Sequence, residues 1–181
     1  MKSRRLEDHF LHELKVIHSL ERQLGKALPD VVGAAYGDEM RDALKANWAM
    51  SKAHFARLTR LRKEFGINLK GHTCEVTATG IEKARALLSE ERPGPIRDLG
   101  LVAAVQAMGH HAMTRYSAAH ILAGQLGLEH AASLLADTIT EKEAEEERLL
   151  AVAGTLVTHT PSDREQDFDR LTGAVCVSLP C

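Results

Sequence analysis

Ionisable side chains interrupt the apolar faces of several helices that the sequence predicts. The clearest case is Glu21, which lies between Ile17 and Leu24 on the apolar face of the first predicted helix. Residues three and four positions apart share one face of an α-helix. A carboxylate at the centre of that face must be paired, protonated, hydrogen-bonded or bound to a metal, because an isolated buried charge is too costly.

Three further residues lie near the midpoints of the other long predicted helices, namely His54, His110 and Glu141. In an antiparallel bundle the midpoints of the helices meet at one level, so these side chains would approach Glu21. Carboxylate and imidazole groups on facing helices are ligands for iron, manganese or zinc. The sequence therefore predicts a candidate metal site formed by Glu21, His54, His110 and Glu141.

The same residues also have structural interpretations. Core histidines are often hydrogen-bonded parts of the structure, and Glu21 can pair with a basic residue or a histidine. The Glu-x-x-His motif, which places two ligands on one helical face, does not occur in this sequence. Two hypotheses therefore stand side by side: a metal-binding protein, and a metal-free bundle whose core polar groups bond to one another.

Composition limits the remaining classes of function. The chain has 181 residues, of which 44% are hydrophobic and 27% charged, as expected for one globular domain. A net charge of −2 without a long basic block argues against nucleic acid or an anionic membrane as a partner. The basic cluster Arg57, Arg60, Arg62 and Lys63 is interpreted as a solvated face. The sequence contains no Gly-rich phosphate loop, no G-x-S-x-G motif and no C-x-x-C motif, so it does not support an enzyme of another class.

Cysteine usage and the N-terminus indicate the compartment. Cys74, Cys176 and Cys181 have no spacing typical of a disulfide scaffold. The first ten residues include no apolar stretch of the kind found in signal peptides, and no apolar run is long enough to cross a membrane. We therefore expect a cytoplasmic protein.

Hydrophobic periodicity predicts an all-α fold with long amphipathic helices and no sheet. The helices are expected over about 4–28, 38–65, 75–90, 96–126 and 129–156. Pro29 is expected to kink or end the first helix, and Asp38 to cap the second. The buried face predicted for the helix at 96–126 is Leu99, Val102, Gln106, His110, Met113 and Ser117.

Four long helices with short connections predict an antiparallel four-helix bundle over residues 1–157. The shorter helix at 75–90 would lie in the connection between the second and third long helices. Residues 158–181 are polar and turn-like, followed by a short apolar end, and are predicted to form a poorly ordered tail.

Short motifs along the chain resemble a known family. They include Leu6–Leu14, Leu20–Leu24, His72-Thr-Cys-Glu75, Val102–Gln106 and Asp137-Thr-Ile139. In this order they resemble the YciE/YciF-type ferritin-like proteins of bacteria over about residues 5–155. The resemblance implies a ferritin-like four-helix bundle, often a homodimer, that is linked to bacterial stress responses and carries a di-metal carboxylate site.

The chain departs from this family pattern at the metal ligands. Acids are implied where this chain has Val16, Ala49, Met50, Gly109 and Ala112. The matching polar residues that remain are Glu21, Glu141, Glu146 and His110. His54 and Glu145 would partly substitute for the missing acids. A full di-iron site uses about four carboxylates and two histidines, so ferroxidase activity is not expected.

The resemblance and the missing acids together suggest a stress-associated protein with a degraded or altered di-metal site. It would act as a dimeric structural or interaction bundle. The alternative is a protein that binds iron, manganese or zinc through a His-rich site in stress protection.

Overall fold

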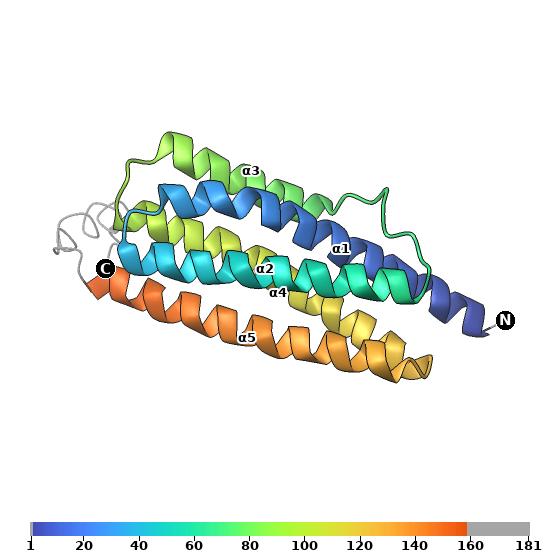
Figure 1. Ribbon diagram of the computed structural model, residues 1–181. Coiled ribbons are helices and arrows are strands. Elements are labelled where there is room, and N and C mark those ends of the chain that lie inside the picture. The colour runs from blue at the N-terminus through green and yellow to red at the C-terminus, as the bar shows by residue number, and fades with distance from the viewer. Residues whose placement is uncertain (1, 159–181) are drawn as a thin grey trace, which may run out of the picture.

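The computed structural model describes residues 2–158, and the described part is built from helices (Figure 1). Their bounds are α1 Lys2–Ala34, α2 Asp38–Glu64, α3 Glu75–Glu90, α4 Pro95–Gln125 and α5 Glu129–Thr158. No strand occurs in this range. The predicted all-α fold is therefore confirmed, and the predicted tail at 158–181 lies outside the described residues except for Thr158.

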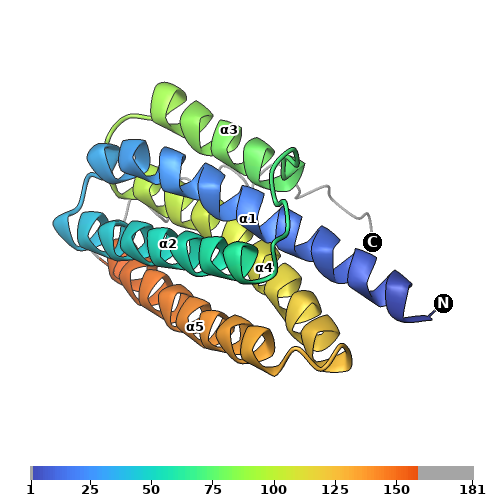
Figure 2. The same cartoon turned by 45° about the vertical axis from the view of Figure 1, so that its right-hand side comes forward.

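The four long helices form an antiparallel bundle. Helices α1 and α5 run in one direction and α2 and α4 in the other, and α1 and α5 each pack against both α2 and α4 (Figures 1 and 2). The short helix α3 lies in the crossover between α2 and α4 and packs on the outside of α1 and α4. This arrangement places the midpoints of the four long helices at one level in the core.

Apolar residues at helical spacing fill the bundle. On α1, Leu14, Ile17, Leu20 and Leu28 are almost completely buried. Side chains from the other helices complete this core: Met40, Leu44, Leu58, Leu61, Leu101 and Leu135. Burial of a leucine or isoleucine contributes about 1.5–3 kcal/mol, so this continuous core holds the helices in register.

Helix α1 continues through Pro29 to Ala34, so the expectation that the helix ends at Pro29 is wrong. Proline lacks an amide hydrogen, so Gly25, four residues earlier, loses its ordinary helical hydrogen-bond donor. The indole Nε1 of Trp48 on α2 donates to the Gly25 carbonyl oxygen over 3.1 Å. A side chain from another helix thus satisfies the acceptor that Pro29 leaves open.

Replacing Trp48 by phenylalanine is expected to destabilise the protein by about 1–2 kcal/mol, because the Gly25 carbonyl loses its donor. Combining Trp48→Phe with Pro29→Ala should reduce that cost, since an alanine at this position supplies the missing amide. Urea unfolding of both single variants and the double variant measures the difference. An equal cost of Trp48→Phe in the two backgrounds would rule out this role for Trp48.

The start of α2 also differs from prediction. Gly37, not Asp38, is the N-cap, and no side chain of the local turn caps the helix. The buried carboxylate of Asp98 on α4 instead accepts hydrogen bonds from the backbone amides of Tyr36, at 3.0 Å, and Gly37, at 2.9 Å. This contact ties the α1–α2 turn to α4. The predicted ends of α2 and α4 at glycines are confirmed by the left-handed φ of Gly66 (63°) and Gly127 (70°).

Candidate functional site

Glu21 lies at the centre of the bundle with no exposed surface, and side chains from three other helices satisfy it. The Lys142 ammonium on α5 lies 3.0 Å from Oε1. Tyr116 on α4 donates its hydroxyl to the same oxygen over 3.2 Å. Ser51 on α2 donates to Oε2 over 2.8 Å. The carboxylate thus joins all four long helices in one hydrogen-bonded cluster.

These partners keep Glu21 ionised. Burial alone would raise its pKa, but the charge of Lys142 and the contact with His54 lower the pKa to about 2. Burial and the nearby carboxylate raise the pKa of Tyr116 well above its ordinary value, so its phenol remains a donor. The ion pair is shielded from water, because the Lys142 side chain is only 4% exposed.

His54 lies between two carboxylates. Its Nε2 is 2.9 Å from Oε2 of Glu141, and its Nδ1 is 3.7 Å from Oε1 of Glu21. The ring is completely buried, and Nδ1 has no hydrogen-bond partner within the described residues. His54 therefore connects the buried centre of the cluster to Glu141, which is 31% exposed at the edge of the bundle.

Arg57 neutralises Glu141. Its guanidinium binds both carboxylate oxygens, at 2.8 and 2.9 Å, and also donates to the Thr138 hydroxyl. The hydrogen bonds from Arg57 lower the pKa of Glu141, and the same contacts raise the pKa of Arg57. This bidentate geometry is the strong form of an arginine–carboxylate pair.

Glu145 is the third carboxylate of the cluster, and it is less well paired. Its Oε2 accepts a hydrogen bond from Asn47 over 3.2 Å and lies 4.0 Å from the Lys142 ammonium. Its Oε1 is buried without a hydrogen-bond partner among the described residues. Burial raises the pKa of Glu145, which favours the neutral acid. The charges of Glu21 and Glu141 are paired with those of Lys142 and Arg57.

Three of the four predicted site residues come together. Glu21, His54 and Glu141 are connected through the imidazole, as the shared level of the helix midpoints suggested. His110 does not join them. Its side chain is 59% exposed, and its Nε2 pairs with Glu146 Oε1 at 2.8 Å on the outer surface.

The position of His110 follows from the rotation of α4, which differs from the predicted one. The buried side chains of α4 include Leu101, Val105, Met108, Ala112 and Tyr116. Leu99, which was predicted to be buried, is 40% exposed. Helix α4 is rich in alanine and packs against α1, α3 and α5, so no single apolar stripe defines its inner face.

Sequence reasoning missed Lys142, Tyr116 and Arg57. Arg57 was assigned to a solvated face, Tyr116 was not among the predicted site residues, and Lys142 lies within a run of acidic residues. Lys142 lies four residues after Thr138, which is buried. That spacing was the available signal, because a lysine on an apolar face requires a partner just as Glu21 does.

The arrangement does not fit a di-metal centre. Lys142 and Arg57 already neutralise Glu21 and Glu141, and a metal ion bound to Glu21 would lie against the ammonium group. Over the described range, no group of three His, Cys, Asp or Glu side chains is placed to hold a metal ion. What these contacts can do chemically is hold four helices together through charge-assisted hydrogen bonds.

Comparison with known proteins identifies the family. The sequence profile of the family described as "Domain of unknown function (DUF892)" matches residues 5–160. The chain belongs to the DUF892 family. It is 29% identical over 154 residues to protein YciF of Escherichia coli K12, covering 84% of this chain and 93% of YciF.

Solved structures agree with this assignment to DUF892. The crystal structure of the E. coli stress protein YciF matches with a TM-score of 0.81 and 28% identity, over 86% of this chain and 98% of YciF. YcfI of Rhodopseudomonas palustris, for which a structural role has been suggested, matches with a TM-score of 0.75 and 26% identity, over 80% of this chain and 92% of YcfI. The predicted YciE/YciF-type family and ferritin-like fold are therefore confirmed. None of the described helices is long and apolar enough to cross a membrane.

Proposed function

We propose that this DUF892 protein is a metal-independent, dimeric structural or interaction bundle that serves the bacterial stress response in the cytoplasm. The observation that carries the proposal is the Lys142 ammonium, 3.0 Å from Glu21 in the centre of the core. In this proposal a fixed side-chain cation holds the position in which a ferritin-like protein would hold a metal ion. The role in stress is suggested by the similarity to the stress protein YciF.

The chemistry of the cluster supports a structural role rather than a catalytic one. Both oxygens of Glu21 and both oxygens of Glu141 accept hydrogen bonds or ion pairs from the protein. A bound substrate or oxidant would have to displace these contacts, and displacement at Glu21 would leave a buried charge unpaired. The cluster is thus suited to specifying how the helices pack.

A homodimer is the partner that this proposal includes. Several large apolar side chains are exposed on the single chain, among them Ile96 (74%), Ile121 (62%) and Tyr36 (59%). Ile96 and Tyr36 lie at the same end of the bundle, where Asp98 of α4 binds the amide of Tyr36. Exposed apolar side chains of this kind are common at protein interfaces.

The alternative is a protein that uses Glu21, His54, His110 and Glu141 to bind iron, manganese or zinc. Its support is that His54 Nδ1 and Glu145 Oε1 are buried without hydrogen-bond partners in the described part of the chain. Both atoms therefore have a lone pair available to coordinate a metal ion. In this alternative Lys142 would have to move away from Glu21 when the metal enters.

Metal content separates the two functions. The protein is purified without an affinity-tag metal and is then loaded with iron, manganese or zinc in the absence of oxygen. We expect less than about 0.1 equivalent of metal, an unfolding temperature unchanged by a chelator, and the sedimentation of a dimer. One equivalent of metal that is lost in Glu21→Gln would support the alternative instead. His110→Ala is the matched variant: metal lost there as well would include His110 among the ligands, and metal retained would exclude it.

A further inference from the structure

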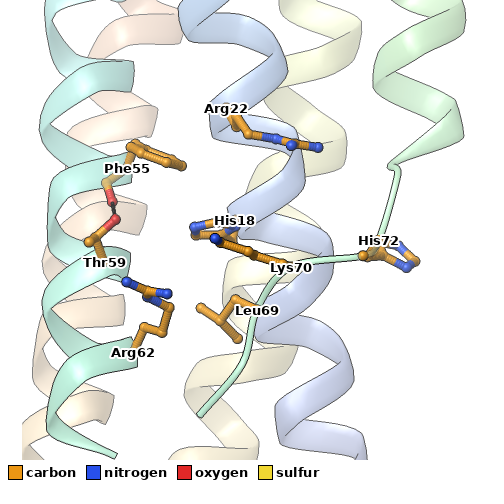
Figure 3. A pocket seen from close by; sticks show the side chains of 9 residues that line it. His18, Arg22, Phe55, Thr59, Arg62, Leu69, Lys70 and His72 are labelled. Carbon is orange, nitrogen blue, oxygen red and sulfur yellow. Dashed lines mark hydrogen bonds between the residues drawn. The ribbon is translucent and has the colours of Figure 1, made fainter. Parts of the chain in front are cut away.

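A second feature of the fold is a cavity of about 430 Å³ outside the Glu21 cluster. It lies between α1, α2 and the connection from α2 to α3 (Figure 3). His18 and Arg22 line it from α1, Phe55 and Arg62 from α2, and Leu69 and Lys70 from the connection. The volume is within the range of small-molecule sites, which is about 300–1,000 Å³.

The fully charged side chains that line this cavity are all basic. Arg22, Arg62 and Lys70 line it, whereas no aspartate or glutamate does. The ion pairs of the described residues include none of these three cations. In addition, Arg62 Nε is buried without a hydrogen-bond partner in the described range. Three uncompensated cations around one cavity favour an anionic ligand.

His18 lines the same cavity, and the charges of two of these cations affect its pKa. Its side chain is mostly buried, and its ring lies against Phe55 with the two ring centroids 4.8 Å apart. Burial lowers the pKa of His18, and the charges of Arg22 and Arg62 lower the pKa further. A neutral imidazole in this position can donate or accept a hydrogen bond toward a bound anion.

The connection from α2 to α3 shapes the other wall. Leu69 is buried there, and it anchors the segment that carries Lys70. The amide of Lys70 donates to Asn68 Oδ1 over 3.0 Å, and Gly71 has a left-handed φ of 85°. Glycine adopts this φ without strain, so the chain can turn sharply after Lys70, and His72 then also lines the cavity.

We propose that this cavity binds a small phosphorylated organic molecule. The forked guanidinium group of Arg62 matches the geometry of a phosphate, and Arg22 and Lys70 add positive charge to the lining of the cavity. Phe55 and Leu69 provide an apolar wall for the organic part of the ligand. The phosphate is held by side chains, which is consistent with the absence of a Gly-rich phosphate loop in the sequence.

Calorimetric titration of the full-length protein with adenosine 5′-monophosphate, inorganic phosphate and adenosine tests the proposal. We expect the monophosphate to bind, inorganic phosphate to bind more weakly and adenosine not to bind. Arg62→Gln should weaken the binding of the monophosphate about tenfold or more, because a charge-assisted hydrogen bond is lost. Phe55→Leu should weaken the binding of the monophosphate more than that of inorganic phosphate.

The controls make the result specific to this cavity. Arg60→Gln removes an exposed cation from α2 that does not line the cavity, and it should leave binding unchanged. If Arg62→Gln does not fold, Lys70→Gln removes another, exposed cation from the lining of the same cavity and tests the same prediction. No binding of either phosphorylated probe, or an equal loss in Arg60→Gln, would overturn the proposal. Binding only to phosphatidylcholine vesicles that contain phosphatidic acid would also overturn it and would indicate a lipid phosphate instead.

Discussion

Replacing Lys142 by methionine is expected to destabilise the protein by about 3–5 kcal/mol, the cost of leaving one partner of a buried ion pair alone. Methionine is similar in length and apolar, so it fills the space of the lysine stem without the charge. Glu21 would then keep Ser51 and Tyr116 as hydrogen-bond donors but lose the ammonium group 3.0 Å away. Urea unfolding at pH 7 measures the loss.

A double variant separates the ion pair from the packing of the lysine stem. Glu21→Gln combined with Lys142→Met removes both charges, and it should cost about 2–3 kcal/mol less than the sum of the single variants. Lys63→Met is the matched control, since Lys63 is exposed on α2, and it should change stability by less than about 0.5 kcal/mol. A cost below about 1 kcal/mol for Lys142→Met, or additive single variants, would contradict the central role of this pair.

Acid is expected to remove about 3 kcal/mol of stability through Glu21 alone. The pKa of Glu21 is lowered in the folded state from its ordinary value of 4.5 to about 2, because Lys142 and His54 outweigh the effect of burial. A lowered carboxyl pKa stabilises the folded state at every pH above the unfolded value. That contribution decreases as the pH falls from about 4.5 and is gone near pH 2.

Glu21→Gln tests this pH dependence directly. The difference in unfolding free energy between the unaltered chain and Glu21→Gln should be largest above about pH 5 and should shrink toward about pH 2. Glu143→Gln, one residue from Lys142 but exposed on α5, provides a control that should follow the unaltered chain at every pH. Parallel curves for the unaltered chain and Glu21→Gln would show that Glu21 carries no such linkage.

Pro29 and Asp38 show where local sequence signals were overridden. Pro29 predicts a break and Asp38 predicts a cap, but Trp48 and Asp98 satisfy the backbone groups concerned from other helices. A buried backbone group requires a hydrogen-bond partner, but nothing requires that the partner be close in sequence. The donor Trp48 and the acceptor Asp98 could be identified only from the packed arrangement of the helices.

Most of the architecture was determined by the sequence itself. Apolar spacing of three and four residues, with Gly66 and Gly127 at helix ends, was sufficient to predict the helices, the bundle and the burial of Glu21. These features depend on residues close together in the chain, because each helix buries its own apolar face. The family motifs, which are also local, led to the ferritin-like fold.

The tertiary structure alone decided how the core charges are neutralised. The partners of Glu21 come from α2, α4 and α5, and the rotation of α4 places Tyr116 inside and His110 outside. An alanine-rich helix has a weak apolar stripe, so its rotation is set by the neighbours that it packs against. The position of Glu21 indicated a buried charge, but only the docking of α5 supplied Lys142 as the cation beside it, because helical periodicity does not specify which distant side chains meet.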